Sequence, residues 1–183
     1  MIVAPSGAMI EARFGFYSSM VRDYRIGHGF DAHRFRRGRK FILGGVEIPY
    51  AFGLIGHSDA DVLLHALINA LLGAMGKGDI GSHFPDTDPR YKGISSRILL
   101  KRVLKIMDRE KCRIVNGDIT LLAQKPRLAP FFKTIRGKLA RLLEVKEEQL
   151  NLKAGTTEKL GWIGRGQGMA AIAVVLIEKD RRR

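Results

Sequence analysis

The chain has 183 residues, 45% of them hydrophobic, which excludes a protein that is mainly disordered. A mean hydropathy of -0.06 and the lack of an apolar run near the ~20 residues that span a bilayer exclude an integral membrane protein. The single cysteine, Cys112, excludes an internal disulfide and a cysteine-only zinc site. One cysteine also fits a reducing compartment, and we expect a cytoplasmic protein.

The charge is strongly basic, with 32 Lys and Arg against 18 Asp and Glu and a net charge of +14. Such a surface attracts nucleic acid or phosphorylated ligands. Much of the excess is local, because five cations lie between Arg34 and Lys40 and the chain ends in three arginines, 181–183. A solvated loop and a tail explain these runs as well as a binding patch does, so charge alone does not decide the function.

The pattern along the chain suggests three parts: an N-terminal extension over residues 1–23, one domain over 24–179 and a basic tail over 180–183. The first part has weak periodicity, and its apolar stretches are too short for a secretory signal, so we expect a flexible extension. Met20 is a second candidate for the natural start, because the regular pattern begins almost immediately after it.

The first half of the domain predicts two strands and a helix. Residues 25–31 predict a strand that runs into a loop, and residues 40–48 predict a second strand with a kink or bulge at Gly44–Gly45. Residues 58–61 resemble a capping box, with a carboxylate three residues after a serine. The helix that follows is rich in Leu and Ala, and we expect it to end among the glycines of residues 73–78.

The second half begins with an amphipathic helix that Ser95 or Ser96 is expected to cap. After it we expect a strand over residues 114–123, a helix over about 130–145, and strands over 150–154 and 169–177 that flank a glycine-rich loop. The residues expected to face inward on these two helices are Leu99, Val103, Ile106, Phe132, Ile135, Leu139 and Leu142. No G-x-G-x-x-G turn joins a first strand to a helix, which disfavours a dinucleotide fold. We therefore expect a single-domain α+β sandwich, ferredoxin-like, of one mixed sheet with helices packed on one face.

The histidines indicate where a metal could bind, because all five lie in the first half of the chain. Asp31 and His33 are two residues apart, so in an extended segment both side chains point to the same side. His65, on the first helix, is a candidate third ligand, and Asp61 one turn before it could orient its ring. One carboxylate and two imidazoles suit Zn2+ with a fourth position open. The alternative is structural, since D-x-H pairs are common and a histidine in an apolar helix usually belongs to the core.

Two segments are candidates for binding anions. The expected helix N-terminus at residues 57–59 offers free backbone N–H groups, with His57 able to donate to a phosphate oxygen; an ordinary cap, worth about 1 kcal/mol, is the alternative. Residues 156–159 lie at the mouth of the glycine-rich loop, where threonine hydroxyls can bind phosphate and Glu158 can hold an ion such as Mg2+. A plain connecting loop is the alternative there, although Lys159 and Arg165 favour anions.

Five segments together resemble the 2-C-methyl-D-erythritol 2,4-cyclodiphosphate synthase family over roughly residues 24–179. Each segment is a weak motif by itself, but five in the family's order are specific. They are RIGHGFDAH at 25–33, HSDAD with the following HA at 57–66, GDIG at 78–81, FPDTD at 84–88 and TTEKLG at 156–161.

The resemblance implies an enzyme of the non-mevalonate route to isoprenoids, a lyase that converts 4-diphosphocytidyl-2-C-methyl-D-erythritol 2-phosphate to the 2,4-cyclodiphosphate and CMP. It implies that Asp31, His33 and His65 hold Zn2+, and that Glu158 and the substrate phosphates hold a second divalent ion, Mg2+ or Mn2+. It also implies that His57 and Thr156 stabilise the transition state. The reaction is an intramolecular phosphoryl transfer, which needs charge screening and positioning but no protein nucleophile.

The resemblance further implies a homotrimer with sites between neighbouring subunits, in which residues 79–81 contact ribose and erythritol and residues 123–129 read cytosine. Arg165 is linked to a cavity on the trimer axis that can hold isoprenoid diphosphates. Besides the metal ligands Asp31, His33 and Glu158 and the catalytic residues His57 and Thr156, the implied substrate-binding residues are Ser58, Asp79, Ile80, Gly81, Phe84, Pro85, Asp86, Thr87, Asp88, Ala123, Gln124, Lys125, Pro126, Arg127, Leu128, Ala129, Thr157, Trp162 and Arg165.

Three positions depart from the family's pattern. Gly155 stands where a threonine often precedes the T-T-E run, Arg127 replaces a usual lysine, and Gln167 replaces a common glutamate, which makes the axis cavity more basic.

Two other functions would use the same metal ligands or the same positive charge. A zinc phosphohydrolase would use the same ligands to activate water, and an RNA-binding module would use the positive charge, although no RNP-like aromatic pattern supports it.

Overall fold

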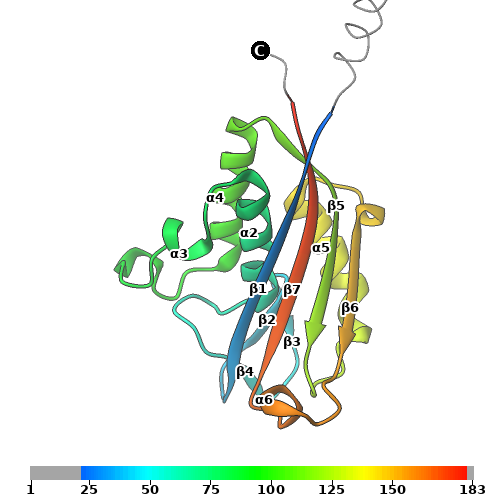
Figure 1. Cartoon of the computed structure of the whole chain (residues 1–183). Coiled ribbons are helices and arrows are strands. Elements are labelled where there is room, and N and C mark those ends of the chain that lie inside the picture. The colour runs from blue at the N-terminus through cyan, green and yellow to red at the C-terminus, as the bar shows by residue number, and fades with distance from the viewer. Residues whose placement is uncertain (1–21, 181–183) are drawn as a thin grey trace, which may run out of the picture.

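The computed structural model describes residues 22–180, which form one mixed five-stranded sheet and one small two-stranded sheet (Figure 1). The strand order in the larger sheet is β4-β1-β7-β5-β6. The strands are β1 (Asp23–Arg37), β2 (Phe41–Leu43), β3 (Val46–Ile48), β4 (Phe52–Leu54), β5 (Cys112–Leu122), β6 (Leu150–Gly155) and β7 (Gly168–Lys179). The helices are α2 (Val62–Met75), α3 (Ile80–His83), α4 (Ser96–Arg109), α5 (Phe132–Leu143) and α6 (Gly161–Gly164), with short 3-10 turns at Pro89–Tyr91, Ala129–Phe131 and Glu147–Gln149.

Strand β7 lies at the centre of the larger sheet. It runs antiparallel to β1, from Asp23 opposite Lys179 to Arg34 opposite Gly168, and antiparallel to β5 on its other side. Strand β6 then pairs parallel with β5. The predicted α+β class and the mixed sheet are confirmed, whereas the ferredoxin-like classification stays a prediction.

Helices α2, α4 and α5 cover one face of the sheet, and Figure 1 shows them behind the strands. Twelve of the fourteen residues of α2 are buried, because the helix lies between the sheet and α4. Its approach to β1 depends on two glycines. A Cβ atom at Gly27 would lie 1.8 Å from the carbonyl oxygen of Ala70, and one at Gly29 would lie 2.0 Å from that of Ala66. The backbones therefore pack directly against each other, which brings the start of α2 to the middle of β1.

The opposite face of the sheet carries exposed apolar side chains. Tyr24, Ile26 and Phe30 on β1 are 51%, 73% and 52% exposed, and Val174 on β7 is 40% exposed. This face of a half-covered sheet would ordinarily be polar.

The structure corrects the predicted strands in two places. Strand β1 does not end at Asp31 but continues to Arg37, so most of the basic stretch lies in a strand that pairs with β4 rather than in a loop. The single strand expected over residues 40–48 is a hairpin, β2 and β3, because Gly44 and Gly45 both adopt positive φ and reverse the chain.

The predicted helix starts also need correction. Asp61, not Ser58, is the N-cap of α2, and its carboxylate accepts from the N–H of Leu64 at 3.2 Å. Ser95 is the N-cap of α4, one of the two predicted positions, but its side chain makes no capping bond; Asp59 accepts from the N–H of Ser96 instead. Of the residues expected to face inward, Ile106, Phe132 and Leu142 are partly buried and pack against the core, and Met107 and Leu143, which were not predicted, are buried in it.

The extension was predicted over residues 1–23 and the tail over 180–183; residues 1–21, with Met20, and 181–183 lie outside the described residues, and Asp23 is the first residue of β1. In the part of the chain that is described, no helix has the length and apolar character needed to cross a membrane.

Candidate functional site

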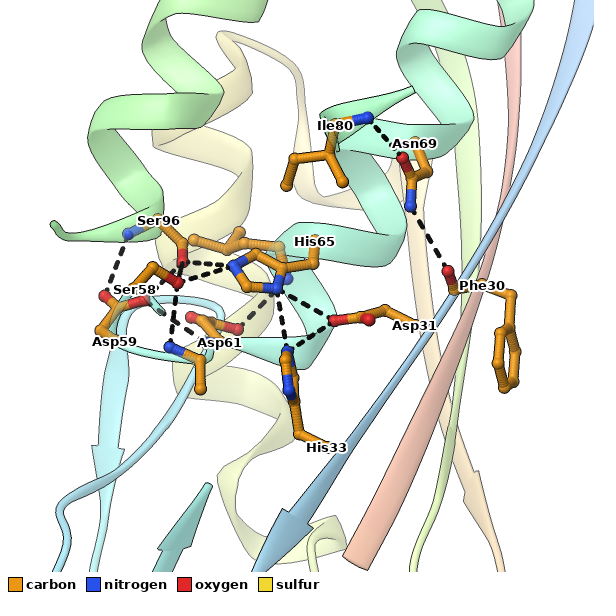
Figure 2. A network of polar contacts seen from close by, with 12 residues as sticks. Phe30, Asp31, His33, Ser58, Asp59, Asp61, His65, Asn69, Ile80 and Ser96 are labelled. Atoms are coloured by element: carbon orange, nitrogen blue, oxygen red, sulfur yellow. Dashed lines mark hydrogen bonds and ion pairs between the residues drawn. The ribbon is translucent and has the colours of Figure 1, made fainter. Parts of the chain in front are cut away.

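Asp31, His33 and His65 converge on one point, as the sequence predicted. Asp31 and His33 point to the same side of β1, and His65 reaches them from the first turn of α2 (Figure 2). The Oδ2 atom of Asp31 lies 2.9 Å from Nε2 of His33 and 3.0 Å from Nδ1 of His65, and these two nitrogens are 3.0 Å apart. One carboxylate oxygen and two imidazole nitrogens within 4.8 Å of one another could hold a metal ion.

The charge state of Asp31 suits a metal ligand. Burial by itself would raise the pKa of this carboxyl group, but the hydrogen bonds and positive charge that His33 and His65 supply outweigh burial. The pKa of Asp31 therefore lies well below its usual range. The carboxylate is ionised at neutral pH, as a ligand to a cation must be.

The far side of the His65 ring contacts two serines rather than the expected aspartate. Nε2 of His65 lies 2.9 Å from Oγ of Ser96 and 3.0 Å from Oγ of Ser58 (Figure 2). Oγ of Ser96 in turn makes a short hydrogen bond to the carboxylate of Asp59. The prediction that Asp61 orients the ring is wrong, because its two carboxylate oxygens are taken up elsewhere.

Asp61 instead ties the β2–β3 turn to α2. Its carboxylate accepts from the N–H groups of Gly44 at 2.9 Å and Gly45 at 2.7 Å, as well as from Leu64. Burial raises the pKa of Asp61 to about 6, against the lowering effect of the backbone N–H groups.

Residues 57–59 were expected to form an anion site at the N-terminus of a helix. That expectation is wrong, because α2 begins at Val62 and the carboxylate of Asp61 caps its first turn.

A cavity of about 420 Å³ opens beside the metal-ligand group. His57 lines it, and Nε2 of His57 is the one buried side-chain nitrogen or oxygen without a hydrogen-bond partner within residues 22–180. The other predicted residues in its lining are His33, Ser58, His65, Ile80, Gly81, Phe84, Pro85 and Asp86. The structure therefore brings four of the five motifs together around one space.

The cavity also has lining residues that the sequence did not assign to a site: Tyr91, Ile94 and Leu99. Leu99 was expected only as a core residue, and no local signal marks Tyr91 or Ile94. Within the predicted segments 79–81 and 84–88, three residues are not in the lining: Asp79, Thr87 and Asp88. Asp79 caps α3, and Asp88 caps a 3-10 turn and pairs with Arg90.

The remaining predicted residues form a second cluster. The segment 123–129 follows β5 and the segment 156–158 follows β6, and because these strands are parallel both segments leave the sheet at the same edge. The N–H of Ala123 donates to the carbonyl of Gly155 at 3.1 Å, and Oγ1 of Thr156 donates to the carboxylate of Glu158 at 2.6 Å. Glu158 is exposed and does not belong to the candidate metal-ligand group of Asp31, His33 and His65.

The two clusters stand apart within one chain. Strand β7 lies between β1, which carries Asp31 and His33, and β5, from which the loop cluster begins. At a strand spacing of about 4.8 Å, that separation is roughly 10 Å. Trp162 and Arg165, also predicted to bind substrate, are exposed at α6.

A carboxylate and two imidazoles beside an open cavity define a protein with a candidate metal centre. The chain belongs to the YgbB family, whose model matches residues 24–178. It is 58% identical over 157 residues to the 2-C-methyl-D-erythritol 2,4-cyclodiphosphate synthase of Geobacillus kaustophilus (strain HTA426), which covers 86% of this chain and 99% of that protein. The resemblance that the five motifs indicated is thereby confirmed.

Solved structures agree with this placement. The bifunctional IspDF protein of Campylobacter jejuni is 41% identical with a TM-score of 0.84, covering 87% of this chain, while this chain spans only 43% of that one. A CDP-bound form of 2C-methyl-D-erythritol-2,4-cyclodiphosphate synthase is 37% identical with a TM-score of 0.78, covering 84% of this chain and 99% of that one.

Proposed function

We propose that this protein converts 4-diphosphocytidyl-2-C-methyl-D-erythritol 2-phosphate to 2-C-methyl-D-erythritol 2,4-cyclodiphosphate and CMP, in the non-mevalonate route to isoprenoids. The observation that carries the proposal is the convergence of Asp31, His33 and His65 beside a cavity, in a chain 58% identical to a named synthase. The enzyme would be a cyclising phosphorus–oxygen lyase. A cytoplasmic location remains a prediction from the sequence.

The proposed reaction forms one P–O bond and breaks another. An oxygen of the 2-phosphate attacks the β-phosphorus, and the bond from that phosphorus to the oxygen bridging to the α-phosphate breaks, so that CMP leaves with the electron pair. Both reacting groups are anionic. The protein must therefore screen their repulsion and hold the folded-back substrate with attacking and leaving oxygens nearly in line.

Zn2+ is the ion proposed for the Asp31 group, because a carboxylate and two imidazoles suit it and leave a fourth position open. When bound, it would supply a Lewis acid that polarises and orients the β-phosphate. His57 lines the adjacent cavity with an unpartnered ring nitrogen, so it can donate to a phosphate oxygen as negative charge shifts. We therefore assign His57 to stabilising the transition state.

The loop cluster is proposed to hold the nucleotide end of the substrate. Glu158 and the substrate phosphates would hold a second divalent ion, Mg2+ or Mn2+, and the Thr156 hydroxyl would contribute to the transition state. The hydrogen bond between these two side chains supports a common role. The backbone of residues 123–129 is proposed to read cytosine; the segment lies beside the Glu158 loop, because the N–H of Lys159 donates to the side chain of Gln124.

A homotrimer with sites between neighbouring subunits is proposed to bring the two clusters together. Support comes from their separation within one chain and from the exposed apolar face of β1 and β7, which a second copy could cover. The axis cavity near Arg165 is proposed to bind isoprenoid diphosphates, with Gln167 altering its charge.

One variant pair tests the assembly. Ile26→Asp places a charge on the apolar sheet face, and we expect monomers by light scattering, loss of CMP release and unchanged Zn2+ binding. Ile98→Asp is the matched control, because Ile98 is also exposed, at 46%, but lies on α4. A monomeric and fully active Ile26→Asp variant would contradict a site shared between subunits.

The reaction itself is tested by incubating the protein with the cytidine diphosphate substrate, Zn2+ and Mg2+ and recording 31P NMR spectra. A cyclic diphosphate formed in equal amount with CMP is the expected result. Linear phosphates with CMP would instead identify a zinc phosphohydrolase that uses the same ligands to activate water, and no turnover at all would refute both.

A further inference from the structure

The first turn of α4 contacts the metal-ligand group through a buried set of polar side chains. Ser96 is fully buried and Ser58 is 6% exposed, and both hydroxyl oxygens lie within hydrogen-bond distance of Nε2 of His65. Ser96 is bonded in turn to Asp59 through its own hydroxyl and its own N–H. The contacts of Ser96 are not local, because Ser96 follows His65 by 31 residues and Asp59 by 37.

The hydrogen bonds can be assigned directions by counting protons. A serine hydroxyl has one proton and can accept at its lone pairs. The carboxylate of Asp59 only accepts, so the short bond between it and Ser96 uses the serine's proton. Oγ of Ser96 is then left with acceptor capacity alone, and Nε2 of His65 must be the donor in the bond at 2.9 Å.

This direction fixes which nitrogen of His65 faces the metal position. Nδ1 is the ring nitrogen that lies 3.0 Å from Asp31 and from His33, so Nδ1 must present its lone pair to a bound cation. Nε2 then carries the ring proton and needs a buried acceptor. Ser96 provides one whose acceptor role is enforced by the carboxylate behind it.

Ser58 also contacts Nε2 of His65, but its hydrogen bonds differ from those of Ser96. Its Oγ already accepts from the N–H of Ala60 at 3.1 Å and lies 3.3 Å from Oγ of Ser96. No carboxylate takes the Ser58 proton among the contacts of the described residues, so the contact between Ser58 and His65 does not by itself set a direction. Once the Ser96 bond places the ring proton on Nε2, Ser58 can only accept from that nitrogen.

We propose that Ser96, with Asp59 behind it, is a positioning residue for the metal site: it holds His65 as the Nε2–H tautomer and aims Nδ1 at the cation. The inference rests on the metal site of the proposed function. Removing such an outer hydrogen-bond partner typically weakens metal binding by about 10- to 100-fold. The same contact makes the start of α4 part of the metal centre.

The test compares Ser96→Ala with Ser95→Ala, its neighbour at the N-cap, whose side chain makes no capping bond. The affinity of each full-length variant for Zn2+ alone is measured by competition with a chromophoric chelator. We expect Ser96→Ala to bind about 10- to 100-fold more weakly than the wild type and Ser95→Ala to match it. In the Zn2+-loaded protein, NMR should detect a slowly exchanging imidazole Nε2–H proton of His65 that Ser96→Ala loses.

Equal Zn2+ affinity in Ser96→Ala and Ser95→Ala, with the Nε2–H signal retained, overturns the role of Ser96 while leaving the metal site standing. A wild-type protein that binds no Zn2+ overturns the metal site and this inference together. If Ser96→Ala does not fold, Asp59→Asn decides: it keeps the volume but removes the charge that fixes the proton. Weaker Zn2+ binding in that variant supports the proposal, and wild-type binding overturns it.

Discussion

Replacing Gly29 by alanine tests whether the contact between β1 and α2 sets the geometry of the metal site. A Cβ atom there would lie 2.0 Å from the carbonyl oxygen of Ala66 and 2.6 Å from the N–H nitrogen of Ala70. Ordinary contact begins near 3.4 Å, so the helix or the strand must give way by about 1.4 Å (3.4 − 2.0). Both obstacles are backbone atoms, which cannot rotate aside.

The displacement falls next to the ligands, because Ala66 follows His65 and Gly29 precedes Asp31 by two residues. Binding sites need their ligands placed to about 0.5 Å, so a shift of this size should weaken metal binding strongly. Overpacking costs typically about 1–3 kcal/mol in stability and sometimes more. We expect Gly29→Ala to lower the melting temperature and to lose tight Zn2+ binding in the same chelator assay.

Gly73→Ala, on α2, is the matched control. Its added Cβ meets nothing closer than 3.8 Å, and alanine is favoured over glycine inside a helix by about 1 kcal/mol. This variant should be as stable as the wild type or more so, with unchanged Zn2+ affinity. If Gly29→Ala melted like Gly73→Ala and bound Zn2+ equally well, the reasoning from the helix–strand contact would be refuted.

Three further variants probe other contacts. His65→Ala should abolish both bound Zn2+ and CMP release, and full turnover in a Zn2+-free variant would exclude the assigned ligand role. Glu158→Gln should raise the Mg2+ concentration needed for half-maximal CMP release while the zinc content stays unchanged; a loss of zinc would contradict separate ion sites. Hydrogen bonds from Lys77 and Lys179 lower the pKa of Glu110 to about 2, so its contribution to stability is fully present above the unfolded pKa of 4.5 and is lost as pH falls toward about 2. Glu110→Gln should therefore flatten that part of the wild-type stability profile in urea titrations, and parallel profiles would refute the assignment.

Two of the three metal ligands, Asp31 and His33, could be predicted from their spacing because their geometry is local, whereas His65, 32 residues after His33, was a candidate that the family's motif then implied. The two-residue spacing of Asp31 and His33 places both side chains on one side of any strand, and the structure confirms it. The hairpin at Gly44–Gly45 also had a local signal, since two glycines between short apolar runs favour a two-residue turn over a bulge. The glycine pair was visible in the sequence, but its interpretation as a kink within one strand was wrong.

The contact behind His65 had no such signal. Asp61 lies one helical turn away and carries the expected charge, but the N–H groups of the β2–β3 turn and of Leu64 engage it. The actual partner, Ser96, lies on another helix, and only the packing of α4 against α2 brings it to the ring. Spacing along a chain predicts side chains on one element, whereas contacts between elements depend on how those elements pack.

The two clusters differ in how the fold supports them, and this difference has a functional consequence. The metal ligands stand on β1 and α2, whose backbones touch at Gly27 and Gly29 and leave little freedom to shift. The loop cluster stands on exposed connections that follow β5 and β6, held by a few hydrogen bonds. Metal binding should therefore be a property of the single folded chain, since its ligands are fixed before any substrate arrives. The loops have fewer restraints of their own, so their final arrangement around a nucleotide has to come from the substrate and from whatever covers the open face of the sheet.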